Sequence, residues 1–418
     1  MKNKIFFQIS LLFFLSVSFA GTENGRFTVA AWGDSRSNHG SSFSEISGYL
    51  KNAKGKTVDV HFHNGDFTGD GDQKYWDRSW AWENVREACV KDYFFMCPSN
   101  HDDDGPYQAE LADILPSNGS NVFYYHQSWD IPGSKRKVHL LACDPYYWDQ
   151  PVEDQLAYFE EELKKANAKP EDWIFGLWHP PSYAPMSYKY PQPTADQQKF
   201  IEFMIPRGGD FVLNGHAHIY RRTHILAKDG SRAETVEGPF SSYTSPDSSS
   251  GMVHIINGRG GTFSNNEYET WENHVFAPRL TENDAVGLLT IMEIDDNTVY
   301  MRTVEIGNEY EEADTLDLWT WTRGAPMPTD TATPVIETLQ QDLPFSVYTH
   351  EQSIRIDIPF DTKYDVDIID LKGNLQKSFY GNERTQLLWE TKTVSAGIYY
   401  LVIKATGQLF TKKITLVK

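Results

Sequence analysis

The sequence predicts an α/β domain followed by a small all-β domain. From residue 26 to residue 216, short apolar runs typical of strands alternate with helical stretches such as 43–53 and 153–168. This alternation is typical of α/β folds. After residue 341, runs of alternating apolar and polar residues follow without a helical pattern, which indicates a separate β domain.

The first twenty residues are predicted to be a secretory signal peptide cleaved after Ala20. Lys2 and Lys4 give the basic start, and small residues at Ser18 and Ala20 fit a signal-peptidase site. The apolar stretch is only about 13 residues long, whereas a membrane-spanning helix needs roughly 20. No later stretch of the sequence is long and apolar enough to span a membrane.

Charge and cysteine content narrow the function classes. The formal net charge of −20 argues against general nucleic-acid binding and against adhesion to anionic membranes. An anionic substrate would therefore need a local positive centre, such as metal ions or a few arginines. Cys89, Cys97 and Cys143 form no Cys-x-x-Cys pair, so we expect buried thiols rather than a structural zinc site, with pairing of Cys89 and Cys97 left open.

Each predicted strand of the first domain is followed by polar residues. The strands are expected within 26–34, 57–66, 90–97, 138–144, 173–179 and 210–216. The carboxyl ends of parallel strands meet at one edge of a sheet, where such folds bind ligands. The polar groups there are Asp34, Asp66, Asn100, His101, Asp102, His179, His216 and His218.

This ordered series of oxygen, amide and imidazole donors predicts a metal site. A single Gly-Asp after a strand is usually a turn, and a single histidine there is usually a hydrogen-bonded surface residue. His216 and His218, however, are two residues apart, so on a strand they leave on the same face. Two imidazoles on one face are a common start of a metal site. Asp144 also ends a strand, but there we expect a turn or helix start.

The order GD, GD, NHD, H and GHAH resembles the calcineurin-like metallophosphoesterase superfamily. The ending GHAHIYRR is similar to the version in purple acid phosphatases and their bacterial relatives. The resemblance covers roughly residues 26–310. It implies a four-layer α/β/β/α sandwich and hydrolysis of phosphate esters. It also implies two divalent or trivalent transition metal ions, for which nitrogen and oxygen donors suit Fe, Mn or Zn.

The resemblance also implies a role for each residue. Asp66 would bridge both metals, Asp34 and His218 would bind the first metal, and Asn100, His179 and His216 would bind the second. A metal-bound hydroxide would attack phosphorus. His101, hydrogen-bonded to Asp102 or to another carboxylate, would stabilise or protonate the leaving oxygen.

Two positions depart from the family pattern. Arg36 stands where most members have a histidine, and Gly69 stands where purple acid phosphatases have a tyrosine. The first metal could be held weakly by Asp34, Asp66 and His218 alone. His39, His63 or Asp70 could instead fill the gap. Arg36 could also replace part of the metal charge, binding phosphate or a carboxylate near the metals, or it could be a plain surface residue.

Several other residues near the motifs have more than one interpretation. Arg222 is expected to form a structural salt bridge. Arg259 lies in the glycine-rich stretch NGRGG, which indicates either a backbone close to the site or a plain turn. Four aromatic residues could form a wall over the substrate or could simply pack in the core. They are Tyr146, Tyr147, Trp148 and Tyr183.

The rest of the first domain is predicted to close with antiparallel strands. Three apolar runs are predicted to be strands joined by turns: GMVHIINGRGG, DAVGLLTIMEIDD and NTVYMRTVEIG. A hairpin is predicted at Asp295, Asp296 and Asn297. The Pro- and Thr-rich segment 322–340 is predicted to be a linker. The catalytic domain would then span 21–321 and the β domain 341–418.

The C-terminal β domain resembles the sorting domain of type IX secretion cargo. The turn Asp370–Gly373, the stretch Gly397–Tyr399 and the closing Lys412–Lys413 carry this resemblance. It implies passage through the periplasm to the surface or exterior of a Gram-negative bacterium, with the type IX machinery as partner. A carbohydrate-binding or fibronectin-like module is the alternative.

The sequence thus predicts a secreted, binuclear, metal-dependent phosphoesterase acting on a small phosphate ester. A phosphodiesterase or nucleotidase of the same fold is the alternative within enzymes. A surface-binding protein with a degenerate metal site is the alternative outside them.

Overall fold

A computed structural model of the chain provides the coordinates. The residues it describes are 25–36, 40–119, 121–145, 150–183, 193–227, 229–234, 240–245, 251–261, 287–307, 309–323, 346–350, 353–359, 361, 363–370, 375–392, 394, 397–405 and 408–416. The predicted signal peptide lies outside them, as does most of the predicted linker.

One sheet of the first domain has seven strands, in the order β11-β15-β14-β13-β1-β2-β3. Strands β1, β2 and β3 are parallel to one another. β13 pairs antiparallel with β1, β14 with β13 and β15 with β14, and β11 pairs parallel with β15. The predicted hairpin is confirmed, because the Asp295 amide donates to the Thr298 carbonyl at 2.9 Å. The strands are β1 (Phe27–Trp32), β2 (Val60–His63), β3 (Phe94–Met96), β11 (Phe240–Ser245), β13 (Leu288–Ile294), β14 (Thr298–Ile306) and β15 (Glu312–Arg323).

The second sheet has six strands, in the order β4-β5-β6-β7-β12-β8. Its strands are β4 (Tyr125–Asp130), β5 (Lys137–Ala142), β6 (Trp173–Leu177), β7 (Gly209–Asn214), β8 (Tyr220–Arg222) and β12 (Val253–Asn257), and β9 (Ile225–Leu226) and β10 (Arg232–Glu234) form a separate pair. The expectation that the run near residue 253 lies in the antiparallel closure is correct only in part, because β12 pairs antiparallel with β8 but parallel with β7, and it lies in the second sheet. An apolar run that is buried throughout fits either sheet equally well.

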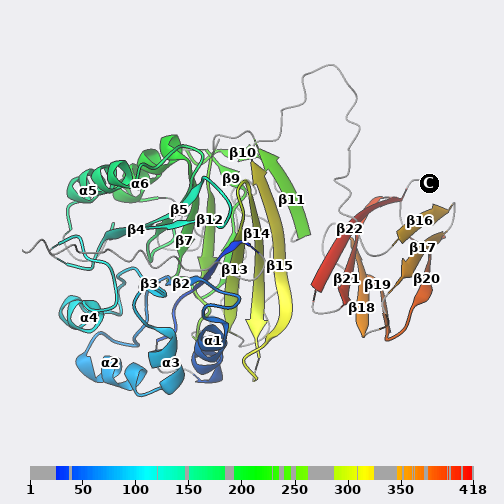
Figure 1. The fold of residues 1–418 in the computed structure, drawn as a ribbon, viewed down its shortest axis with the longest axis horizontal. Coiled ribbons are helices and arrows are strands. Elements are labelled where there is room, and N and C mark those ends of the chain that lie inside the picture. The colour runs from blue at the N-terminus through cyan, green and yellow to red at the C-terminus, as the bar shows by residue number, and fades with distance from the viewer. Residues whose placement is uncertain are drawn as a thin grey trace, which may run out of the picture.

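The two sheets pack face to face and helices cover both outer sides (Figure 1). Phe62 of the first sheet contacts Phe175 of the second, with ring centroids 6.3 Å apart, and both belong to one buried core. Phe43 of α1 packs on Trp32, whereas Phe159 of α5 joins the core outside the second sheet. The predicted four-layer α/β/β/α architecture is confirmed. The helices are α1 (Gly40–Ala53), α2 (Gln73–Trp80), α3 (Glu83–Ala88), α4 (Asp104–Leu111), α5 (Val152–Lys165), α6 (Ala195–Met204) and the short η1 (Ile205–Arg207).

Residues at the helix ends determine where the two helices on the second sheet begin. α5 has Glu153 and Asp154 in its first turn and lysines in its last, an arrangement that complements the helix dipole. α6 begins with a capping box in which Thr194 and Gln197 bond to each other's backbone amides. Both helices therefore start at defined residues.

Buried ion pairs join the two sheets. Arg222 of β8 binds Asp317 of β15, with Nε 2.8 Å from Oδ2, and Tyr220 donates to the same oxygen at 2.8 Å. The predicted structural salt bridge of Arg222 is confirmed. Arg323 pairs with Asp210 at the end of β15, which runs two residues into the predicted linker. Losing one partner of such a pair would leave a buried charge and cost several kcal/mol, roughly 3–5.

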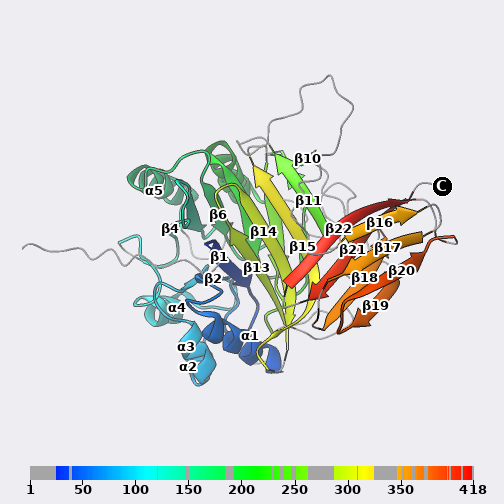
Figure 2. The ribbon, with the colours of Figure 1, turned by 45° about the vertical axis from the view of Figure 1, so that its right-hand side comes forward.

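The C-terminal region is all β, as predicted. A three-stranded sheet β16-β17-β20 and a four-stranded sheet β19-β18-β21-β22 (Figure 2) enclose a core that includes Ile356, Val366 and Leu401. The strands are β16 (Ser346–His350), β17 (Ser353–Ile358), β18 (Tyr364–Asp370), β19 (Leu375–Gly381), β20 (Thr385–Glu390), β21 (Gly397–Ala405) and β22 (Gln408–Leu416).

Two further expectations concern the whole chain. All three cysteines are free and buried, so Cys89 and Cys97 do not pair. Among the residues that the structure describes, no helix has both the length and the apolar character needed to cross a membrane.

Candidate metal centre

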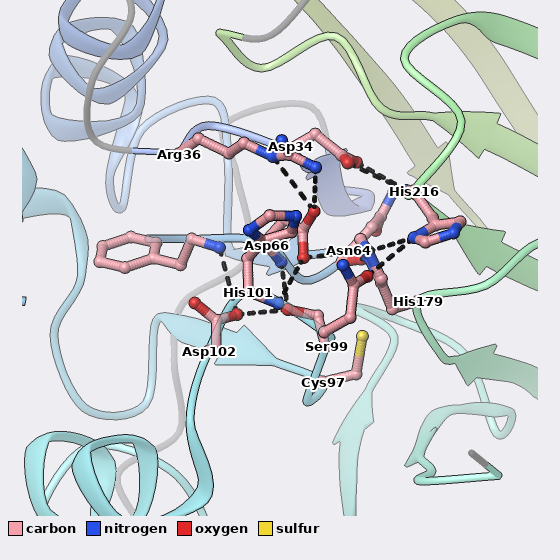
Figure 3. A network of polar contacts seen from close by, with 12 residues as sticks. Asp34, Arg36, Asn64, Asp66, Cys97, Ser99, His101, Asp102, His179 and His216 are labelled. Carbon is pink, nitrogen blue, oxygen red and sulfur yellow. Dashed lines mark hydrogen bonds and ion pairs between the residues drawn. The ribbon is translucent and has the colours of Figure 1, made fainter. Parts of the chain in front are cut away.

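Loops from distant parts of the sequence meet at the carboxyl ends of β1, β2, β3, β6 and β7 (Figure 3). Backbone hydrogen bonds fix them to one another. The Asp34 amide donates to the Gly65 carbonyl at 2.9 Å, and the Gly215 amide donates to the His179 carbonyl at 2.9 Å. The predicted strand ends therefore converge on one place.

Four residues of these loops have a left-handed backbone, with φ of 58° at Asp34, 46° at Arg36, 55° at Asp66 and 66° at His216. Residues other than glycine rarely adopt this conformation, which costs about 1–3 kcal/mol each. Such strain persists only where the surroundings enforce it, and it gathers at functional sites.

Glycines allow the loops to approach closely. A Cβ on Gly215 would lie 2.4 Å from Oδ2 of Asp34, and one on Gly65 would lie 2.6 Å from Nδ1 of His179. A Cβ on Gly258 would lie 2.8 Å from the same Asp34 oxygen. The glycine-rich stretch around Arg259 therefore lies against the site, which was one of its two interpretations.

The first donor group consists of Asp34, Asp66 and His218, whose ligand atoms lie within 4.8 Å of one another. Asp34 is fully buried and accepts the His216 amide at 2.9 Å. The buried Nε2 of His218 lies 3.4 Å from Oδ1 of Asp34 and has no hydrogen-bond partner. A buried imidazole nitrogen that lacks a hydrogen-bond partner and lies beside carboxylates fits a cation ligand.

The second donor group consists of Asp66, His179 and His216, also within 4.8 Å. His179 Nδ1 lies 2.6 Å from the Asn64 carbonyl, which can only accept, so Nδ1 carries the hydrogen. Nε2 of His179 lies 3.1 Å from Oδ1 of Asp66. Oδ1 of Asn100 lies 2.8 Å from Nδ1 of His216 and adds a fourth donor. Because both groups share Asp66, the donors fit a pair of metal ions bridged by one carboxylate.

Burial and charge shift the pKa values of these residues strongly. Burial opposes protonation of His179, but Asp66 and Asp34 raise its pKa to about 9. Burial also opposes ionisation of Asp66, but His179 and Arg36 hold its pKa well below the usual range. Burial, followed by the charge of His179, lowers the pKa of His216 to about 3. The buried carboxylates therefore attract positive charge to this site.

Arg36 supplies part of that charge. Its Nη2 lies 2.9 Å and its Nε 3.3 Å from Oδ2 of Asp66. The side chain of Arg36 is only 20% exposed, so it is not a plain surface residue. The contact is with the carboxylate that both donor groups share.

The expectation that the His101 ring is hydrogen-bonded to Asp102 or to another carboxylate is wrong for Nδ1. Nδ1 of His101 binds the Gly69 carbonyl at 3.0 Å instead. Both oxygens of Asp102 are engaged, because they accept the amides of Phe67 and Thr68 and the hydroxyls of Thr68 and Ser99. Asp102 thus shapes the loop that carries Asp66, while the His101 amide donates to Oδ1 of Asp66 at 3.2 Å.

Two of the three residues suggested as substitutes for the missing ligands, His63 and Asp70, join neither donor group. His63 is buried, with Nε2 3.1 Å from the Ser35 hydroxyl, and burial lowers its pKa well below the usual range. Asp70 is exposed. His39 lies outside the described residues.

Asp144 and Tyr183 have structural roles away from the donor groups. Asp144 is held by Gln155 through its backbone amide and carbonyl, as expected of a turn. Tyr183 packs in the core against His254, so it forms no aromatic wall. Tyr146, Tyr147 and Trp148 lie outside the described residues.

Sequence reasoning missed two supporting residues. Ser99 accepts the Asp66 amide at 2.7 Å and donates to Asp102 at 2.6 Å. Asn64 orients His179 through its carbonyl. Their only signal was their place beside the motifs, in SNHD and HNGD.

Comparisons with known proteins agree with this geometry. Residues 28–220 match the family model described as Calcineurin-like phosphoesterase, and residues 351–417 match the one described as Secretion system C-terminal sorting domain.

Two curated relatives and one solved structure that are similar to this chain are named purple acid phosphatases. Purple acid phosphatase 15 of Arabidopsis thaliana is 26% identical over 118 residues, which is 28% of this chain and 21% of the relative. Probable purple acid phosphatase 20 of the same plant is 24% identical over 140 residues, 30% and 32% of the two chains. The chain thus spans a third or less of these relatives. The structure of purple acid phosphatase PPD1 from yellow lupin (Lupinus luteus) seeds has a similar fold, with a TM-score of 0.51 and 14% identity over 73% of this chain and 57% of that one.

Proposed function

Residues 28–220 belong to the calcineurin-like phosphoesterase family, and on that premise we propose that the chain is a metal-dependent phosphoric ester hydrolase. One observation supports this most strongly. Two groups of buried or half-buried donors share the carboxylate of Asp66, which is an arrangement suited to two neighbouring cations.

The proposed ligands divide between the two groups. Asp34 and His218 hold one ion, Asn100, His179 and His216 hold the other, and Asp66 contributes to both. Such paired ions would lower the pKa of a water molecule from about 15.7 toward about 7 and neutralise phosphate charge. The nitrogen and oxygen donors suit Fe, Mn or Zn.

Residues of the chain position these ligands and the substrate. Asn64 orients His179, and Asp102 with Ser99 holds the loop that carries Asp66. His101 donates through Nδ1 to the Gly69 carbonyl, so its protonated ring carries a second proton on Nε2. That proton can be passed to the leaving oxygen of a phosphate ester.

Hydrolysis of p-nitrophenyl phosphate and of its bis-ester by the purified chain tests this proposal. We expect release of p-nitrophenol from the monoester, loss of that activity after treatment with a chelator, and recovery on adding Zn²⁺ or Mn²⁺. Faster cleavage of the bis-ester would favour the phosphodiesterase alternative. Metal binding without hydrolysis of either ester would favour a surface-binding protein and contradict an enzyme.

We further propose that the chain is exported through the type IX secretion machinery of a Gram-negative bacterium. The match of residues 351–417 to a sorting domain supports this. Deleting residues 341–418 should leave the protein in the periplasm, as measured by fractionation of the cells. Unchanged secretion of the truncated chain would contradict the proposal.

A further inference from the structure

Arg36 binds Asp66 with both its main chain and its side chain. The Arg36 amide donates to the Asp66 carbonyl at 3.0 Å. The guanidinium donates from Nη2 and Nε to Oδ2 of Asp66 at 2.9 and 3.3 Å. The main-chain bond holds the Arg36 backbone beside Asp66, and the guanidinium reaches the carboxylate of the same residue.

The two oxygens of Asp66 therefore have different surroundings. Oδ2 faces the permanent positive charge of Arg36. Oδ1 faces the Nε2 of His179 and the amide of His101, at 3.1 and 3.2 Å. A metal ion that shares Asp66 with Arg36 meets a cation on the same carboxylate, and like charges at this distance repel.

The two donor groups also differ in their number of donors. Asp66, His179 and His216 are joined by the amide oxygen of Asn100. Among the residues that the structure describes, the group of Asp34, Asp66 and His218 has these three protein donors, and the buried His63 instead lies against Ser35. Since Oδ1 of Asp66 faces His179 of the second group, Oδ2, where the guanidinium lies, is the oxygen left to the first group. The guanidinium and the smaller number of described donors therefore both weaken the first group.

We propose that Arg36 makes the two metal sites unequal. The group with His179, His216 and Asn100 binds one ion tightly, and the group with Asp34 and His218 binds a second ion weakly and exchangeably. While the weak site is empty, the guanidinium serves as the counter-charge of Asp66. This inference rests on the proposed metal-dependent function and adds that occupancy of the second site follows the free metal concentration.

Calorimetric titration of the chelator-stripped chain with Zn²⁺ tests the inference. The wild-type chain should bind one ion tightly and a second at least about tenfold more weakly. Arg36→Gln removes the cation, and Arg36→His removes it and adds a possible donor. Both should strengthen the weaker site by about 10- to 100-fold and leave the tighter site unchanged.

Two controls separate charge from other effects. Arg36→Lys keeps a cation, so the inequality should remain. Arg207→Gln removes an arginine that pairs with Glu160 near the opposite end of β7, and it should change neither affinity. Circular dichroism of each variant verifies folding.

The outcomes are distinguishable from those for the proposed function. Equal affinities in the wild-type chain, or an unchanged ratio in both Arg36→Gln and Arg36→His, would overturn the inference while metal-dependent hydrolysis remained intact. A chain that binds no metal and hydrolyses no phosphate ester would overturn both.

Discussion

Nδ1 of His101 donates a hydrogen bond to the backbone carbonyl of Gly69, 3.0 Å away. A carbonyl oxygen only accepts, so the proton on Nδ1 is fixed and Nε2 is the nitrogen that exchanges protons. The carbonyl of Gly69, rather than a carboxylate, thus orients the imidazole proposed to act on the leaving group.

Replacing His101 by glutamine should slow hydrolysis without removing metal. Loss of a positioned general acid lowers kcat by about 10²–10⁴. The loss should be larger for phenyl phosphate than for p-nitrophenyl phosphate, because p-nitrophenolate leaves more readily without a proton. Steady-state kinetics on both esters, with metal content measured on the same samples, checks this. An equal loss on both substrates would show that His101 does not protonate the leaving oxygen.

Asp102→Ala should destabilise the fold. The buried carboxylate accepts hydrogen bonds from Phe67, Thr68 and Ser99. Removing it leaves those donors without a hydrogen-bond partner. We expect the free energy of unfolding to fall by about 3 kcal/mol, because buried donors lose their partner. We also expect the metal affinity to fall, because the loop that carries Asp66 loses its support. Urea unfolding measures the first quantity. Asp103→Ala, at an exposed position whose side chain makes no capping bond, is the matched control. Equal stability of the two variants would contradict this role.

Gly215→Ala should weaken metal binding. The added methyl group would lie 2.4 Å from Oδ2 of Asp34 and 2.7 Å from the Asn64 carbonyl, so it would displace a proposed ligand. The Zn²⁺ affinity of the affected site should fall by about 10- to 100-fold, as measured by calorimetry. Gly105→Ala in α4, where a methyl group meets nothing within 4 Å, should bind like the wild-type chain. Unchanged affinity in Gly215→Ala would show that the loops adjust without cost.

Asp59→Asn should change how stability depends on pH. Burial raises the pKa of Asp59 from 3.8 to about 6, against the effect of its hydrogen bond from the Thr28 amide. Between these values the native state binds the proton more tightly than the unfolded chain. The contribution of Asp59 to stability therefore falls as pH rises from about 4 to about 6.

As the pH rises from 4 to 7, the free energy of unfolding of Asp59→Asn should therefore increase relative to that of the wild type by about 1–2 kcal/mol. Urea unfolding across this range measures it. Asp77→Asn, on the exposed face of α2, serves as the control. A difference that stays constant with pH would contradict the shifted pKa.

Much of the site could be predicted because it depends on where strands end. Asp34, Asp66, His179 and His216 each follow a short apolar run, and parallel strands bring such ends to one edge whatever their order in the sheet. The metal-ligand roles of these residues remain predictions until a metal is measured.

Other features depend on contacts that the sequence does not display. β12 is as apolar as a strand of either sheet, so its pairing with β7 and β8 decides where it lies. Asp102 is next to His101 in the sequence, but its carboxylate accepts hydrogen bonds from the amides of Phe67 and Thr68 and not from the His101 ring. The contact of Arg36 with Asp66 requires two left-handed residues that no propensity would favour.

The metal content of the purified chain and of Asp66→Ala, measured by mass spectrometry of the elements, tests the central claim most directly. Asp66 is the carboxylate that both donor groups share. We predict at least one tightly bound transition metal ion per wild-type chain and the loss of metal from the variant. A wild-type chain without stoichiometric metal, or a variant that retains the wild-type content, would contradict the account.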